Sequence, residues 1–235
     1  MRGVLIIPAY NEEERLGAVL DRVRAAAVSE DVVVINDGSR DATHRVAEEH
    51  GARVIDHEVN RGYARALSTG LEHASDAGYD YLVYMDADGQ HDPQYVASLR
   101  ARAGEPDAPD VIVGSRFVED TGYKAPVGRK LGMLVFSWLT RAVGGRRIYD
   151  TTSGFKLIRR TAFAALRAQS FNDYHAEMLI YCMVAGLRVV EVPVQVSERG
   201  GGTSMYSWLD AVKYPVRTLA KIAQLVPEAR KHRVR

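Results

Sequence analysis

Residues 80–93 of this 235-residue chain read Asp-Tyr-Leu-Val-Tyr-Met-Asp-Ala-Asp-Gly-Gln-His-Asp-Pro. The first six positions form a largely apolar run, typical of a buried strand, and the rest are polar and turn-forming. The same order, an apolar run and then polar residues, recurs after residues 8, 36 and 56, with helical patterns between the runs. Strands that alternate with amphipathic helices indicate a parallel sheet with crossover helices. The stretch therefore predicts a doubly wound, mostly parallel α/β sheet, Rossmann-like in its first half.

Periodicity predicts the elements of this fold. Strands are expected at residues 3–8, 31–36, 52–56, 80–85, 110–115 and 188–196, with strand character at 150–159. Helices are expected at residues 12–27, 41–50, 62–77, 129–143, 161–168, 175–185 and 206–225. Asn11 and Glu14 have the spacing of a capping box for the first helix. We expect one large domain at residues 1–204, followed by a basic amphipathic helix and tail at residues 205–235.

Composition excludes several classes of protein. The chain has 31 Lys plus Arg against 30 Asp plus Glu and is 46% hydrophobic, so it should fold and gives no global reason to expect nucleic acid as a partner. The single cysteine, Cys182, cannot form an internal disulfide, and no secretory leader follows Met1. No uncharged apolar run reaches the roughly 18 residues that a membrane-spanning helix needs. We therefore expect a cytosolic protein.

The charge is unevenly distributed along the chain. From residue 199 on there are eight Lys or Arg against two acids, whereas the preceding 198 residues carry 23 basic against 28 acidic groups. Within residues 206–225, apolar positions recur at helical spacing beside a basic row of Lys213, Arg217 and Lys221. Such a helix suits peripheral binding to an anionic membrane surface. The alternative is a helix packed on its own domain or on a second subunit of a homo-oligomer.

The polar residues after the strands are the candidate site, because open parallel sheets bind ligands outside the carboxyl ends of their strands. Asp86 and Asp88 lie two apart after an apolar strand, and both carboxylates point to one side if the extended geometry persists. With Gln90 and His91 near, they offer oxygen donors that suit Mg²⁺ or Mn²⁺ held partly by substrate phosphates. The alternative is that these residues only form a turn before Pro93.

The first strand ends in Pro8-Ala9-Tyr10-Asn11 and not in a glycine-rich phosphate loop. This lowers the expectation of a dinucleotide oxidoreductase or a P-loop NTPase. A nucleotide can instead be held by the metal and by Asp37, whose carboxylate can accept hydrogen bonds from a base N–H. We interpret Ser39 and Asp41 as helix-capping residues.

A set of ordered motifs carries a resemblance to a known family. The motifs are Pro8-Ala9-Tyr10-Asn11-Glu12, Asn36 to Thr43, Asn60-Arg61-Gly62, Asp86 to Pro93, Gly114-Ser115-Arg116, Asp150 to Lys156, Glu177, and Glu191 to Val194 with Arg199 and Ser204. The first four resemble the family 2 glycosyltransferases of GT-A fold. The whole set, over about residues 3–206, resembles the polyprenyl-phosphate sugar transferases of the dolichyl-phosphate mannosyltransferase kind.

The resemblance implies an inverting, metal-dependent transfer of a sugar from a UDP- or GDP-linked donor to a polyprenyl phosphate, at the cytosolic membrane face. It implies Asp86, Asp88 and Gln90 as ligands of Mg²⁺ or Mn²⁺, with Asp88 also assigned to catalysis. The implied donor-binding residues are Pro8, Tyr10, Glu12, Asp37, Asp86 and Arg199. The physical logic agrees, because a cation neutralises the charge that develops on a departing diphosphate.

On the acceptor side the resemblance implies Arg116 and Arg129 near the acceptor phosphate, which guanidinium groups bind well. We interpret Lys130 as part of a solvated basic face. A phosphate monoester, with a second pKa of about 6, attacks without strong help from a base, whereas a hydroxyl acceptor needs one. Asp150 is the candidate base. Glu177 and His175 are weaker candidates, with ordinary helix N-terminal residues as the alternative.

Two positions depart from the relatives, and other functions remain as alternatives. Asn36 replaces a frequent Asp, and Ala64 replaces a frequent Gly. Many relatives with lipid acceptors carry a membrane anchor after the catalytic domain that this sequence lacks, so a soluble small-molecule or protein hydroxyl remains the alternative acceptor. A non-catalytic nucleotide-binding protein is a further alternative, against which the retained Asp86 and Asp88 argue.

Overall fold

The computed structural model of the chain describes residues 1–118, 127–172, 174–197 and 208–231, without the side chains of 127–134 and 208–216. The strands are β1 (Gly3–Ala9), β2 (Asp31–Asn36), β3 (Arg53–Asp56), β4 (Tyr81–Tyr84), β5 (Val111–Ser115), β6 (Lys156–Arg159) and β7 (Val189–Pro193). The helices are α1 (Glu13–Ala25), α2 (Thr43–Glu49), α3 (Tyr63–Asp76), α4 (Tyr95–Ala103), α5 (Val127–Gly144), α6 (Arg160–Arg167), α7 (Ala176–Val184) and α8 (Trp208–Lys231).

Among the described residues the strands form one sheet in the order β3-β2-β1-β4-β6-β5-β7. β1 pairs in parallel with β2 on one side and with β4 on the other, so the winding of the sheet reverses at β1. The mostly parallel, doubly wound sheet is confirmed, and β6 alone among these strands runs antiparallel to its neighbours β4 and β5. The point where the winding reverses is where such sheets bind ligands.

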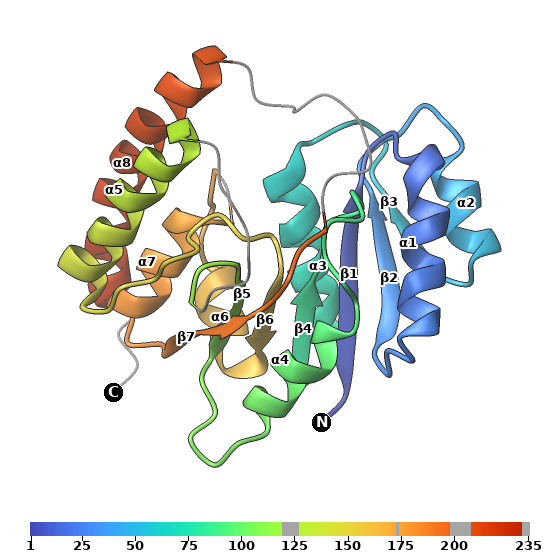
Figure 1. The fold of residues 1–235 in the computed structure, drawn as a ribbon, viewed down its shortest axis with the longest axis horizontal. Coiled ribbons are helices and arrows are strands. Elements are labelled where there is room, and N and C mark those ends of the chain that lie inside the picture. Colours follow the sequence, from blue (N-terminus) through green and yellow to red (C-terminus); the bar gives the residue numbers. More distant parts are fainter. Residues whose placement is uncertain (119–126, 173, 198–207, 232–235) are drawn as a thin grey trace.

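Helices cover both faces of the sheet (Figure 1). Successive residues of β1 point to opposite faces, so Leu5 and Ile7 pack with α1, α2 and α4 while Val4 and Ile6 pack with α3, α6 and α7. Every residue of β1 is buried, as expected for a central parallel strand. The carboxyl ends of β1, β2 and β4 therefore meet at one edge of a rigid three-layer core.

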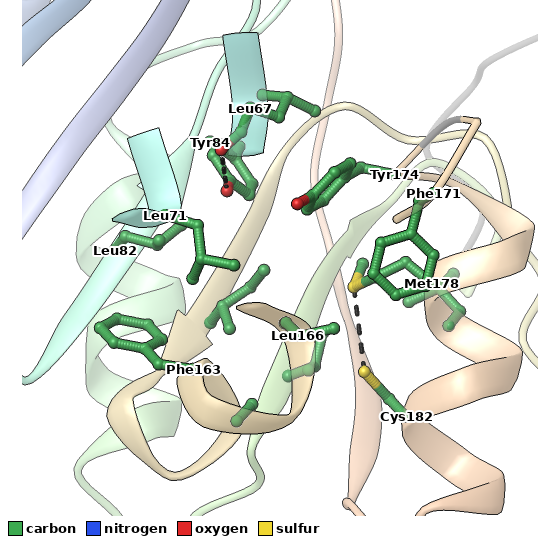
Figure 2. Packing of buried hydrophobic residues seen from close by; sticks show 14 of the residues in the cluster. Leu67, Leu71, Leu82, Tyr84, Phe163, Leu166, Phe171, Tyr174, Met178 and Cys182 are labelled. Atoms are coloured by element: carbon green, nitrogen blue, oxygen red, sulfur yellow. Dashed lines mark hydrogen bonds between the residues drawn. The ribbon is translucent and has the colours of Figure 1, made fainter. Parts of the chain in front are cut away.

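The core between the sheet and α3, α6 and α7 is closely packed (Figure 2). The Tyr84 hydroxyl donates a hydrogen bond of 2.7 Å to the carbonyl of Leu67 on α3. The rings of Phe171 and Tyr174 meet edge to face at 5.3 Å. Cys182 is free and buried, its Sγ lies 3.9 Å from Met178 Sδ, and burial raises the pKa of its thiol. Cys182 is thus a core residue.

The structure differs from the predicted elements in several places. α4 has no counterpart among the predicted helices, and β6 begins at Lys156 because residues 150–155 form a turn. The predicted capping box is wrong. α1 begins after Glu12 without a side-chain cap, and Asn11 has a positive φ of 54°. The Asn11 side chain instead accepts a hydrogen bond from the Arg40 N–H, which ties the ends of β1 and β2 together.

The C-terminal helix α8 packs on α7 and is longer than predicted, since it continues through Pro215 to Lys231. Ile222, Leu225 and Ala229 are buried, and the last two belong to the core on the α7 side of the sheet. Packing of this helix on its own domain, one of the two alternatives, is therefore correct for its described C-terminal half. In the described part of the chain we find no helix with the length and apolar character required to cross a bilayer.

Candidate active site

The ends of β1 and β2 are joined by a network of short hydrogen bonds. Pro8 is buried in β1 opposite Ile35, and Tyr10 just beyond the strand is 39% exposed. The N–H of Asn11 donates to Ser39 Oγ at 2.9 Å, and that of Glu12 donates to Thr43 Oγ1 at 2.8 Å. Of the predicted donor residues here, Tyr10 and Glu12 lie at the accessible edge, and Pro8 supports them from within the sheet.

Asp37 is buried after β2 and holds the loop that leads to α3. Its Oδ1 lies 2.6 Å from His57 Nδ1 and accepts the Arg61 N–H at 2.9 Å, while Oδ2 accepts the Gly62 N–H at 2.8 Å. A Cβ added at the neighbouring Gly38, which has a φ of +70°, would lie 2.4 Å from the backbone of Val59. Asp37 therefore fixes the course of the segment 57–62, beyond its predicted role toward a base.

Asp86 is oriented by three elements. Its side chain is 29% exposed, Oδ1 accepts the Tyr63 hydroxyl at 2.8 Å, and Oδ2 lies 3.7 Å from His91 Nε2. A Cβ added at Gly154 would lie 2.1 Å from Oδ2, so the backbone of the 150–155 turn closely approaches the carboxylate. Burial raises the pKa of Asp86, but the hydrogen bonds and charge of His91 and the Tyr63 hydroxyl outweigh it and lower this pKa to about 2. Asp86 is therefore a carboxylate at neutral pH.

The loop after Asp86 is a turn that keeps both carboxylates accessible. The extended geometry does not persist to Asp88, since β4 ends at Tyr84 and residues 87–88 are a turn. Asp88 Oδ1 accepts the Gln90 N–H at 3.0 Å. Ala87 is buried between Asp86 and Asp88, which are both partly exposed. The turn before Pro93 and an open pair of carboxylates thus coexist.

Asp86, Asp88 and Gln90 have the chemistry of a site that binds a cation together with substrate phosphates. Two carboxylates and the Gln90 amide are oxygen donors, which Mg²⁺ and Mn²⁺ prefer, and such ions are commonly bound by one or two carboxylates plus substrate phosphates. Among the described residues, no three His, Cys, Asp or Glu side chains form a complete cage for a metal. The donor set fits a divalent cation that arrives with a diphosphate.

The segment after β7 closes over this loop. His91 forms a β-bridge with Val196, the Ser197 N–H donates to the Gln90 carbonyl at 2.9 Å, and the His91 ring stacks on Phe155 at 5.2 Å. Arg199, predicted to bind the donor, lies two residues further on and outside the described residues. Arg129 lies in α5, and its side chain is also outside the description.

Arg116 and Asp150, both predicted for the acceptor side, form a largely buried ion pair. Arg116 Nε donates to Asp150 Oδ2 and Nη2 donates to Oδ1, each at 2.7 Å, and the Arg116 N–H also donates to Oδ2 at 3.1 Å. Glu191 in β7 accepts the N–H groups of Tyr149 and Asp150 at 2.9 and 2.8 Å. Burial raises the pKa of Asp150, but the Arg116 contacts outweigh it, so this pKa is lowered. Burial raises the pKa of Glu191.

This geometry makes Asp150 a weak proton acceptor, because the carboxylate is fully buried and Arg116 stabilises its charge. Glu177 is also fully buried and accepts the Asn172 N–H at 2.9 Å, in keeping with the structural alternative. His175 stacks on Tyr63 with ring centroids 5.8 Å apart. The contacts of Asp150, Glu177 and His175 therefore give little support for any of them as the base that a hydroxyl acceptor would need.

Three contributors to the site have no predicted role. Tyr63 and Gly154 both contact or closely approach Asp86, and Arg22 Nη1 donates to the Gly89 carbonyl at 2.7 Å. Gly154 stands inside the quoted motif Asp150 to Lys156, and Tyr63 directly follows the motif Asn60-Arg61-Gly62. Arg22 lies within a helix pattern that gives no sign of this contact, since the two residues are 67 positions apart.

Comparison with known proteins finds similar sugar transferases. The undecaprenyl-phosphate mannosyltransferase of Micrococcus luteus is 32% identical over 219 residues, which are 88% of this chain and 88% of that one. The UDP-N-acetylglucosamine–dolichyl-phosphate N-acetylglucosaminyltransferase of Methanococcus voltae is 30% identical, over 81% of this chain and 84% of that one.

The fold and the family follow from two further matches. The structure of glucosyl-3-phosphoglycerate synthase from Mycobacterium tuberculosis with Mn²⁺, UDP and glucosyl-3-phosphoglycerate superimposes with a TM-score of 0.70 at 19% identity, covering 96% of this chain and 80% of that one, which shows the GT-A fold. The sequence model "Glycosyl transferase family 2" matches residues 4–167. The chain is a glycosyltransferase and belongs to glycosyl transferase family 2.

Proposed function

We propose that this glycosyltransferase moves a sugar from a UDP- or GDP-linked donor to a polyprenyl phosphate, with inversion and with a bound divalent cation. The observation that carries the proposal is the placement of two acidic centres. The partly exposed carboxylate of Asp86 lies beside the 150–155 turn, whose first residue, Asp150, forms the buried pair with Arg116. The similar proteins named for undecaprenyl and dolichyl phosphates support the acceptor.

On the donor side, Asp86, Asp88 and Gln90 would hold Mg²⁺ or Mn²⁺ on the diphosphate. The bound ion would supply positive charge where the leaving diphosphate gains negative charge. Asp37 holds segment 57–62 at the nucleoside end, next to Tyr10 and Glu12 at the accessible edge. The Ser197 N–H is hydrogen-bonded to Gln90, and the predicted diphosphate contact Arg199 lies beyond it, outside the described residues.

On the acceptor side, Arg116 and Arg129 would bind the phosphate that attacks the anomeric carbon. A phosphate monoester is already largely ionised at neutral pH, so no side chain has to remove a proton. Arg116 bonds Asp150 through Nε and Nη2, which fixes the plane of the guanidinium group. The edge of the guanidinium that carries Nη1 therefore points away from the carboxylate. We therefore assign to Asp150 the orientation of Arg116 and replace the predicted role as a base.

The membrane contact is best supported on α5. Its outward face carries Val135 and Trp138, which are 47% and 67% exposed. Exposed Arg141, Arg146 and Arg147 follow, and exposed Tyr149 connects this surface to Asp150. Interfacial Trp and Tyr with flanking cations favour an anionic bilayer. The described half of α8 is partly buried against α7, so we propose α5 as the peripheral contact and α8 as support.

The donor and acceptor are tested together in one assay. Purified protein is incubated with a panel of UDP- and GDP-sugars and a short-chain polyprenyl phosphate, with Mg²⁺, Mn²⁺ or a chelator. We expect nucleoside diphosphate release and a lipid-soluble sugar product that need both the lipid and the metal. Product formed only with soluble alcohols would refute the acceptor, and full turnover with chelator would refute the metal.

The membrane contact needs its own measurement. Trp138→Ala should weaken co-sedimentation with vesicles that contain anionic lipid and leave the melting temperature almost unchanged, because this exposed side chain contributes little to folding. Leu219→Ala, on the exposed face of α8, is the matched control. Equal loss of binding in both variants, or in neither, would contradict a contact centred on α5.

A further inference from the structure

We propose that Tyr63 is a positioning residue for Asp86 that couples cation binding to nucleotide binding. The inference rests on the proposed function, in which Asp86 holds a divalent cation on the donor diphosphate. It concerns one side chain at the start of α3 that touches two parts of the site.

The first observation is how Tyr63 is held. Its neighbour Gly62 precedes α3 with a φ of +90°, and the Gly62 N–H is hydrogen-bonded to buried Asp37 at 2.8 Å. His57 braces the same arrangement, with Nδ1 at 2.6 Å from Asp37 Oδ1 and Nε2 at 2.9 Å from Thr69 Oγ1 on α3. The backbone of Tyr63 is thus fixed from the carboxyl end of β2.

The second observation is what the Tyr63 side chain contacts. The hydroxyl donates to Asp86 Oδ1 at 2.8 Å, and the ring stacks on His175 at the start of α7, with an angle of 22° between the rings. This stacking restricts the side-chain rotamers of Tyr63 and so keeps its hydroxyl directed at Asp86. Since the other oxygen of Asp86 faces His91 and the backbone at Gly154, Tyr63 restricts the remaining freedom of the carboxylate.

These contacts form a short path between the two ends of the donor site. Asp37 bonds the backbone of Gly62, the next residue is Tyr63, and Tyr63 bonds Asp86. A nucleoside diphosphate that orders the loop near Asp37 would therefore also order Asp86, and a cation on Asp86 would strengthen nucleotide binding by the same factor. Partners that orient a metal-binding carboxylate typically change metal affinity by 10–100-fold.

The test measures the dissociation constant of UDP and of GDP by calorimetry, with and without Mn²⁺. For the nucleotide that the wild type binds, the ratio of the two constants gives the coupling. Tyr63→Phe keeps the ring and removes the hydroxyl, so we expect the ratio to fall about 10-fold while the constant without Mn²⁺ stays the same. Tyr84→Phe is the matched control, because it removes a buried tyrosine hydroxyl that is bonded to α3 at Leu67 and not to Asp86.

The outcomes separate this inference from the proposed function. A wild-type ratio in Tyr63→Phe would overturn the inference and leave the metal site standing. A wild-type protein whose nucleotide binding ignores Mn²⁺ would overturn the metal site itself. Tyr63→Leu, with melting temperatures for each variant, serves as a second variant, and it should lose the coupling as Tyr63→Phe does. Loss in Tyr84→Phe as well would make the effect a general consequence of altered packing and contradict the inference.

Discussion

Asp86 and Asp150 both have a lowered pKa, but they are held in opposite ways. Asp86 is partly exposed and is oriented by the Tyr63 hydroxyl and by His91. Asp150 is fully buried and is bonded on both oxygens by one guanidinium, that of Arg116. The first carboxylate is accessible to a cation that comes with a ligand, and the second already has its cation within the protein.

The difference in burial and partners gives the carboxylates of Asp86 and Asp150 different chemical properties. A partly exposed carboxylate without a bidentate cationic partner keeps its negative charge available, whereas a buried ion pair is electrically balanced and serves mainly to orient its partners. In the proposed function, the donor half of the site would be arranged around the open carboxylate of Asp86. The acceptor half would be arranged around the balanced Arg116–Asp150 pair.

The largest effect is expected from removing the charge of Asp86. Asp86→Asn keeps the shape and loses the charge that holds the cation, so kcat/KM should fall by about 10³-fold, the loss typical of a strong electrostatic group. The measurement is release of nucleoside diphosphate at saturating Mn²⁺. Asp92→Asn, in the same loop, is the matched control, since Asp92 only bonds Gln94 in a local turn. Similar losses in both variants would mean that loop folding, and not the cation, explains the effect.

Breaking the Arg116–Asp150 pair should mainly reduce stability. Arg116→Met leaves a buried carboxylate without its cation, which typically costs about 3–5 kcal/mol of unfolding free energy. Arg45→Met, which removes an exposed pair with Glu49, should change it by less than about 1 kcal/mol. Urea unfolding measures both. The double variant Arg116→Met/Asp150→Leu should regain part of the loss, and additive losses would contradict the pairing.

The close approach of Gly154 to Asp86 predicts an intermediate effect on activity. In Gly154→Ala the new methyl group would lie 2.1 Å from Asp86 Oδ2, so the carboxylate has to move. Displacement of a group in an active site by about 1 Å can cost about 10²-fold in rate. Gly104→Ala, whose nearest neighbour is a backbone oxygen at 3.4 Å, is the control. A Gly154→Ala enzyme with wild-type activity would show that Asp86 tolerates a different orientation.

The sequence was sufficient to locate β1 to β4 and the polar residues at their ends, and less so for the contacts around Arg116 and Asp150, for physical reasons. Local periodicity predicts β1 to β4, since each strand is an apolar run with a polar end. The same logic locates Asp37, Asp86 and Asp88 at one sheet edge. It does not reveal the Tyr63–Asp86 bond or the Arg116–Asp150 pair, because these join residues 23 and 34 positions apart.

The antiparallel strand and the extra helix illustrate the same limit. β6 is four residues long, and its direction is set by pairing with β4 and β5 and not by its own sequence. α4 buries only Val96, Leu99 and Ala103, so its apolar pattern is short. The motif resemblance singled out Asp150 as a candidate base. Its burial and pairing, which decide its chemistry, arise only from tertiary contacts.

The smallest effect is expected in the acid range of pH. A carboxyl whose folded pKa lies below its unfolded value of about 3.9 stabilises the fold above that value, and the stabilisation is lost as pH falls through the folded pKa. The difference in melting temperature between wild type and Asp150→Asn should therefore be constant from pH 7 to 5 and shrink below about pH 4. Glu191, whose pKa is raised by burial, acts with the opposite sign, since its protonation on acidification relieves a cost in the folded state. In Glu191→Gln, which keeps Asp150, the melting temperature should therefore fall more steeply on acidification than in the wild type. A melting-temperature difference between wild type and Asp150→Asn that stays constant to pH 3 would contradict a stabilising pair at Asp150.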